Sequence, residues 1–217
     1  MKITHTNNRR LGAILWLLSI QYYVMQLVVA TFWAKDSGYS WTKNTISDLA
    51  NTHCGRYGGR LVCSPQHTIM NFSFIILGIT MVGGSYFLRK ELAASQAYRL
   101  GLAFTAIAGV GTILVGLFPE NTISTLHIIG AALPFTVGNL GMVVLGTCLR
   151  QQPILLRGYS ILSGIVGLTA LVLFITNTYL GIGIGGMERF VGYPLTIWMI
   201  VFGSYLLLID RFVTTQV

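Results

Sequence analysis

The sequence predicts an all-α protein that crosses a membrane six times, with both termini in the cytoplasm. Hydrophobic residues make up 53% of the 217 residues and charged residues only 9%, whereas a soluble domain carries roughly 25% charged residues. The charged residues leave six uncharged windows, 11–34, 61–88, 100–119, 121–149, 158–187 and 190–209. About 20 apolar residues suffice to cross a bilayer as a helix. This composition excludes a soluble enzyme, a small secreted disulfide protein and a disordered chain.

The windows predict transmembrane helices rather than barrel strands, because they are too long and too continuously apolar for strands. We expect one domain, 1–217, with an extracytoplasmic loop at 34–66. The helices are predicted near 11–33, 67–88, 97–118, 123–148, 155–177 and 187–209.

The basic residues predict the orientation, because cytoplasmic loops carry an excess of Lys and Arg. With the N-terminus inside, nine basic residues are cytoplasmic, namely Lys2, Arg9, Arg10, Arg89, Lys90, Arg99, Arg150, Arg157 and Arg211. Five are then outside: Lys35, Lys43, Arg56, Arg60 and Arg189. The net charge of +8 is therefore explained by topology, and no nucleic-acid partner is expected. The expected location is the cell membrane.

The loop at 34–66 has two features of its own. The segment 44–50, Asn-Thr-Ile-Ser-Asp-Leu-Ala, predicts a short helix or turn at the membrane interface. Cys54 and Cys63 lie on the outer side, where disulfides persist, and the eight residues between them can close a small loop. We expect a disulfide, with two free thiols as the alternative. Cys148 is expected to be a small packing residue.

The segment 118–127 combines turn chemistry with a histidine. Pro119 is expected to end the third helix, and Asn121 or Thr122 can cap the fourth. His127 falls one turn inside that helix, on a face with the small residues Ala131, Pro134 and Gly138. An ionisable residue at membrane depth is a candidate functional residue. The alternative is an interfacial histidine bonded to a loop carbonyl.

A glycine-rich segment precedes the sixth helix. Residues 181–186 match G-x-G-x-x-G, but no strand precedes them, so we expect a turn rather than a nucleotide site. Glu188 would then fall in the first helical turn, where the helix dipole favours a carboxylate.

Polar residues gather at the outer ends of the predicted helices, which suggests an outward-facing polar cavity. The candidate ligand-binding residues are Asp48, Asn71, Glu120, His127, Glu188 and Arg189. His127 and Asp48 are the candidate catalytic residues. A hydrolase would need Ser47 or Ser64 with His127 and an acid, Asp48 or Glu188. The alternative is structural, an ion pair between Asp48 and Arg189.

No metal or cofactor is expected. His67, His127, Asp48 and Glu188 are possible ligands, but no spacing typical of zinc connects them.

Several of these motifs together resemble a known family. They are the segment 44–49, Ser64-Pro65 with Asn71, Phe118-Pro119-Glu120 before His127, and Glu188-Arg189. In this combination the chain resembles the six-helix bacterial and archaeal membrane proteins grouped as domain-of-unknown-function family 998. The Ile-Ser-Asp element also resembles that of the eukaryotic DRAM and Frag-like proteins, some of which are linked to lipid or GPI-anchor handling.

The leading functional hypothesis is a protein that binds or modifies a lipid or other amphiphile at the outer leaflet. Membrane lipids are the expected partners, and a homodimer is possible. One alternative is a small dimeric transporter, with Gly109–Gly111 and Pro134 as candidate helix interruptions. Another is a non-catalytic subunit held by small-residue contacts such as Ser160-x-x-x-Gly164.

Overall fold

The structure, a computed structural model, describes residues 7–35, 38–92, 95–149 and 152–214. Lys2 and Arg150, two of the nine basic residues predicted to be cytoplasmic, lie outside the described residues. The predicted orientation stays a prediction.

Six helices are long and apolar enough to span a membrane, which confirms the predicted number. The first span consists of α1 (Asn7–Leu17) and α2 (Ile20–Thr31), the second is α3 (His67–Leu92), and the third is α4 (Gln96–Leu117). The fourth consists of α5 (Ser124–Leu133), η2 (Pro134–Gly138) and α6 (Asn139–Cys148). The last two are α7 (Ile154–Ile175) and α8 (Gly183–Thr214). The chain is a multi-pass membrane protein.

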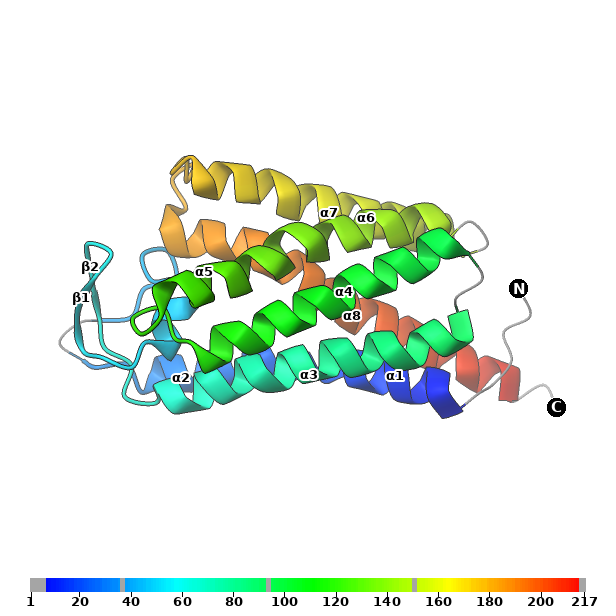
Figure 1. Cartoon of the computed structure of the whole chain (residues 1–217), viewed down its shortest axis with the longest axis horizontal. Coiled ribbons are helices and arrows are strands. Elements are labelled where there is room, and N and C mark those ends of the chain that lie inside the picture. Colours follow the sequence, from blue (N-terminus) through cyan, green and yellow to red (C-terminus); the bar gives the residue numbers. More distant parts are fainter. Residues whose placement is uncertain (1–6, 36–37, 93–94, 150–151, 215–217) are drawn as a thin grey trace.

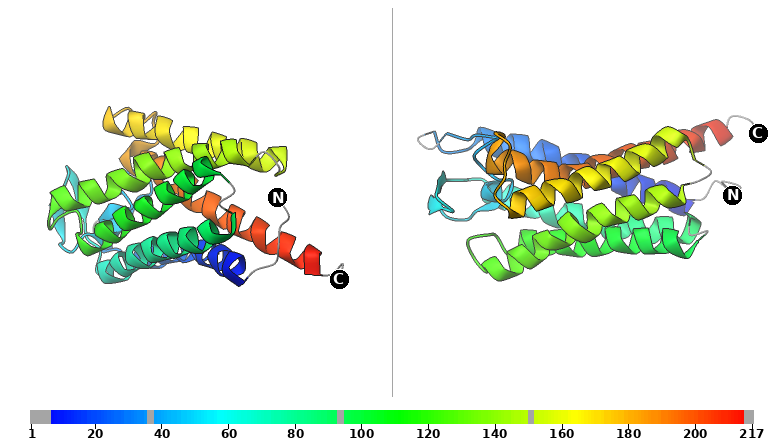
Figure 2. Two further views of the ribbon diagram at one scale, coloured as in Figure 1. Left: turned by 45° about the vertical axis from the view of Figure 1, so that its right-hand side comes forward. Right: turned by 90° about the horizontal axis from the view of Figure 1, so that it is seen from above.

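The six spans form one elongated bundle in which successive spans are neighbours (Figures 1 and 2). The ring closes because α8 packs against α1. Glycines allow close helix contacts, as is common in membranes. A Cβ on Gly78 of α3 would lie 2.4 Å from the carbonyl oxygen of Gly109 on α4. Helices α3 and α4 therefore approach each other closely at this contact.

Two of the candidate spans contain an internal proline. Pro134 begins the π-helical segment η2 within the fourth span, and Pro194 lies inside α8. A π segment leaves backbone carbonyls without their usual partner. Asn139 compensates, because its side-chain amide donates to the carbonyls of Phe135, at 2.9 Å, and Val191, at 3.1 Å. Of the predicted interruptions, Pro134 is therefore a real one, whereas Gly109–Gly111 lies within the continuous helix α4.

The bundle core contains an aromatic cluster. Trp16 and Trp198 are fully buried, with ring centroids 5.3 Å apart, and Phe202 stacks on Trp198 at 5.0 Å. Their indole nitrogens are satisfied: Trp198 donates to Ser160 at 2.7 Å and Trp16 to the Met81 carbonyl at 3.4 Å.

One end of the bundle, called here the hairpin end, carries the long loop. It contains the 3-10 helix η1 (Ser47–Ala50) and the antiparallel strands β1 (Gly55–Tyr57) and β2 (Arg60–Val62). Gly58 and Gly59 form the turn with positive φ angles, as a two-residue hairpin turn requires. The short helix or turn predicted at 44–50 is present as η1, which covers Ser47–Ala50.

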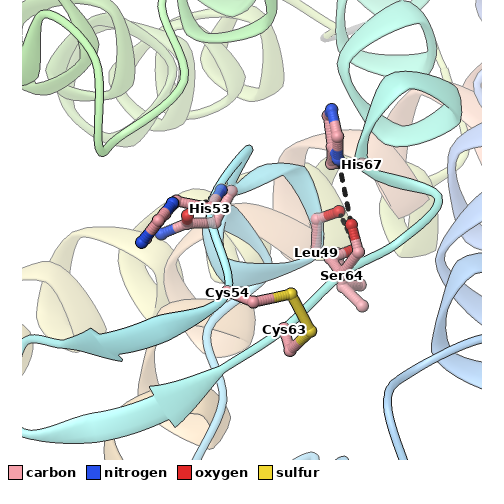
Figure 3. Close-up of a disulfide and its surroundings, with 7 residues drawn as sticks. Leu49, His53, Cys54, Cys63, Ser64 and His67 are labelled. Carbon is pink, nitrogen blue, oxygen red and sulfur yellow. Dashed lines mark hydrogen bonds between the residues drawn. A yellow bond between two sulfur atoms is a disulfide. The ribbon is translucent and has the colours of Figure 1, made fainter.

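The predicted disulfide is also confirmed, because Cys54 and Cys63 are bonded at the base of this hairpin (Figure 3). Beside it, the hydroxyl of Ser64 points to the carbonyl of Leu49, at 2.7 Å, and His67 turns toward the carbonyl of Ser64. Cys148 is a free, partly buried thiol.

Two local predictions are wrong. Neither Asn121 nor Thr122 caps α5, whose N-cap is Ile123 without a side-chain bond. The Thr122 hydroxyl donates instead to the Pro119 carbonyl. Glu188 is not in the first turn of the last helix, because α8 begins earlier, at Gly183. Helix-dipole capping therefore does not explain this carboxylate.

Candidate functional site

The loop before α3 is shaped by reciprocal hydrogen bonds between Thr45 and Asp48. The Thr45 hydroxyl accepts from the Asp48 backbone N–H at 3.1 Å, and the Asp48 carboxylate accepts from the Thr45 backbone N–H at 2.9 Å. This is the pattern of a capping box, with Asp in place of Glu. It holds η1 at the hairpin end and fixes Ser47, which lies between the two residues.

Arg60 lies on strand β2 and forms an ion pair with Asp48. The guanidinium makes a two-pronged contact, from Nε to Oδ2 at 2.6 Å and from Nη2 to Oδ1 at 2.7 Å. The Asp48 residue is 0% exposed, so the ion pair compensates a fully desolvated charge. Because Asp48 also accepts from Asn44 at 3.2 Å, its oxygens are saturated by the protein.

Glu120, in the loop between α4 and α5, lies beside this pair. Its Oε1 accepts from the Asn51 amide at 2.9 Å, while its Oε2 is 3.9 Å from Arg60 Nη2. Burial, together with the neighbouring Asp48 carboxylate, raises the pKa of Glu120 to about 9. Glu120 is therefore protonated and neutral at physiological pH.

Ser47, His127 and Glu188 form a second buried group. Ser47 Oγ lies 3.0 Å from His127 Nε2 and donates to Glu188 Oε1 at 3.2 Å. His127 Nδ1 lies 2.9 Å from the carbonyl oxygen of Phe118. A carbonyl only accepts, so Nδ1 carries a hydrogen and Nε2 of the neutral ring is an acceptor. Glu188 also accepts from the backbone N–H of Ile46.

A cleft of about 320 Å³ brings members of both groups to one surface. Its polar wall includes Arg60, Glu120, Ser47, His127 and Glu188. Its apolar wall is contributed by α5, η2 and the end of α7, through Ile128, Ala132, Phe135, Leu171, Phe174 and Ile175. Ile128 is 63% and Ile175 67% exposed on the outside of the bundle. The cleft is therefore bordered by apolar residues that are exposed on the outside of the bundle.

The remaining candidates lie elsewhere. Arg189 does not pair with Asp48, which corrects the structural alternative. It donates instead to the carbonyls of Trp41, Asn44 and Gly185 and lines a different groove, between α7 and α8. Asn71 donates to the Ala50 carbonyl at 3.0 Å. Within the described ranges, no group of three or more His, Cys, Asp or Glu side chains could hold a metal ion.

Arg60 is the site residue that sequence reasoning missed. Its charge suggested only a role in topology. The available signal was its position directly after Gly58-Gly59, because a two-residue turn between Cys54 and Cys63 predicts a hairpin. The docking of the hairpin was not readable from the sequence. It depends on contacts such as Tyr57, whose hydroxyl donates to the Glu120 carbonyl at 2.7 Å.

Comparison with known proteins supports the resemblance. The family described as "Protein of unknown function (DUF998)" matches residues 20–205. The chain belongs to the DUF998 family. The match covers all six spans in whole or in part and includes every residue of the cleft. No curated protein and no solved structure matches the chain. The similarity to DRAM and Frag-like proteins stays a prediction.

Proposed function

We propose that this DUF998 protein binds an amphiphile, such as a lipid, in the cleft between α5 and α7. The supporting observation is the division of its walls. One side presents Ser47, His127, Glu120 and Arg60, and the other presents aliphatic and aromatic side chains from two spans. Binding pockets commonly occupy roughly 300–1,000 Å³ and place a few polar groups in an apolar lining.

The amphiphile enters from the leaflet at the hairpin end, which the basic residues predict to be the outer one. Its apolar chain lies between Ile128 and Ile175, the two exposed residues at the rim. Its polar head reaches the buried hydroxyl and imidazole behind them. Arg60 on the cleft wall offers a cationic hydrogen-bond donor, which suits an ester, carboxylate or phosphate oxygen.

A substitution that fills the cleft tests this proposal. Ala132 lines the cleft from the exposed side of α5, so Ala132→Trp obstructs it without changing the buried polar groups. Val110→Trp is the matched control, because Val110 is 49% exposed on α4 and is not a lining residue of the cleft. Native mass spectrometry of protein extracted in mild detergent should show a lipid-sized adduct on the wild type and on Val110→Trp, but not on Ala132→Trp.

Equal adducts on all three proteins, or none on any, would refute amphiphile binding in the cleft. The second of these results would favour the non-catalytic subunit and direct the search to protein partners.

Transport of the same amphiphile is the second candidate function. The observation in its favour is that the interrupted fourth span, at Pro134 and Phe135, borders a second cavity of about 50 Å³ beneath Ser47 and Glu188. Phe135 lines both spaces. Movement of a fluorescent lipid across reconstituted vesicles would distinguish a transporter from a binding protein.

A further inference from the structure

We infer that Ser47 and His127 form a nucleophile and general base that cleave a carboxylic ester in an amphiphile bound at the cleft. This inference rests on the proposed amphiphile binding and adds a reaction to it. It begins from the distance of 3.0 Å between Ser47 Oγ and His127 Nε2, which is the separation expected of a serine and the base that activates it.

The hydrogen bonds of His127 give the ring the required tautomer. The Phe118 carbonyl holds the hydrogen on Nδ1, so the lone pair of Nε2 faces the Ser47 hydroxyl. In a serine hydrolase triad an acidic residue performs this orienting role. Here a backbone carbonyl orients the ring, and the carboxyl group is on the other side of the serine.

Glu188 completes the arrangement. The single hydrogen of the Ser47 hydroxyl can serve either Glu188 Oε1, at 3.2 Å, or His127 Nε2. When His127 takes the proton, the nearby carboxylate stabilises the resulting imidazolium. Glu188 is held in place by the backbone N–H of Ile46, which precedes Ser47 in the chain.

The reaction proceeds in two steps. Ser47 Oγ bonds to the acyl carbon, the ester C–O bond breaks, and the serine proton passes through His127 Nε2 to the departing alcohol oxygen. Water then attacks the acyl-serine with His127 as base, which releases the acid and restores the hydroxyl. Arg60 contributes a cation to the cleft wall, where negative charge develops on the acyl oxygen.

Ser64, the other serine considered as a nucleophile, is the matched control. It is also buried on the same loop, but its hydroxyl donates to the carbonyl of Leu49 and its carbonyl, not its hydroxyl, faces His67 (Figure 3). It therefore has no base to activate it.

The experiment treats the purified full-length protein with an alkyl fluorophosphonate, which phosphonylates activated serine hydroxyls and releases fluoride. Intact mass and peptide mapping should show one adduct, on Ser47, in the wild type and in Ser64→Ala. Ser47→Ala should not be labelled. His127→Gln should react slower by roughly 10²–10⁴-fold, the usual contribution of a general base. Hydrolysis of p-nitrophenyl octanoate should follow the same order.

No adduct on the wild type, or an equal adduct on Ser47→Ala, would overturn the inference. If labelling fails in this way but Ser47→Ala still binds a lipid in native mass spectrometry, the binding proposal survives and only the proposed ester cleavage is wrong. If Ser47→Ala does not fold, Ser47→Cys in a Cys148→Ala background replaces it. That thiol should be alkylated by iodoacetamide faster than in the same protein carrying His127→Gln, and equal rates would count against activation by His127.

Discussion

Arg60 is the cation that pairs with the Asp48 carboxylate at the hairpin end, beside the neutral Glu120. Its guanidinium donates two hydrogen bonds to the Asp48 carboxylate, and its Nη2 lies 3.9 Å from Glu120 Oε2. We predict that Arg60→Ala destabilises the protein by about 3–5 kcal/mol, because a fully buried Asp48 carboxylate then has no counter-charge. Thermal unfolding in detergent measures this effect.

Two further variants separate the ion pair from simple loss of a side chain. Arg60→Lys should recover only part of the stability, because an ammonium cannot make the two-pronged contact. In an Asp48→Asn background, Arg60→Ala should destabilise the protein much less than it does in the wild type. Additive effects of the two changes would show that the pair is not coupled.

Glu120 predicts how stability varies with pH. Its pKa is about 9 in the folded protein against an ordinary value of 4.5, so between these values the folded state binds more protons than the unfolded state. The contribution of Glu120 to the free energy of unfolding is fully present below pH 4.5 and is lost as the pH rises to about 9.

Glu120→Gln, which stays neutral, should flatten this decline and melt at a higher temperature than the wild type near pH 8. The measurement is the melting temperature from pH 5 to pH 9. A variant that melts below the wild type at pH 8, with an unchanged slope, would contradict the assigned protonation.

At the scale of elements, the disulfide-closed hairpin of β1 and β2 positions the side chains of Arg60 and Tyr57. The bond between Cys54 and Cys63 closes a short loop, and such closure contributes about 3 kcal/mol in the chain-entropy model. We predict that reduction lowers the melting temperature of the wild type. Reduction should lower the melting temperature of Arg60→Ala by a smaller amount, because the hairpin of this variant has already lost the Arg60–Asp48 contact with η1.

The control is Cys54→Ser with Cys63→Ser, which should melt at the same temperature with and without reductant. If reduction shifts Arg60→Ala as far as the wild type, the hairpin stabilises the bundle by some route other than Arg60.

The elements also show what could be predicted from the sequence. The spans were predictable because a bilayer permits little but long apolar helices. The disulfide was predictable from two cysteines in one outer loop. The partner of Asp48 was not predictable, because Arg60 and Arg189 are both basic residues of the predicted outer side. Which of them meets Asp48 depends on the hairpin register, which pairs Tyr57 with Arg60.

His127 shows the same limit at closer range. The alternative of a bond to a loop carbonyl is confirmed at Nδ1, while Nε2 faces Ser47, and a functional role of His127 stays a prediction. The sequence could not rank Ser47 above Ser64, because the two differ only in where their hydroxyls point after folding. Glu188 was assigned to a helix start because the glycines of the segment 181–186 usually signal a turn, whereas α8 includes three of these four glycines.

At the scale of the whole molecule, the predicted orientation places the cleft in the outer leaflet. Six spans put the start of α1 and the end of α8 at the same end of the bundle, opposite the hairpin (Figure 1). We predict that a green fluorescent protein fused after Val217 is fluorescent in cells and that an alkaline phosphatase fused there is inactive. The reverse result would place the hairpin end, and the cleft, on the cytoplasmic side.

The central claim is that an amphiphile lies between α5 and α7 with its head at Ser47 and His127. Photo-crosslinking with a fatty-acyl lipid that carries a diazirine on its chain tests it most directly. The account predicts crosslinked peptides from α5 and the end of α7, including the segments around Ala132 and Leu171, and their loss in Ala132→Trp but not in Val110→Trp. Crosslinks spread evenly over the lipid-facing surfaces of all six spans, and unchanged by Ala132→Trp, would contradict it.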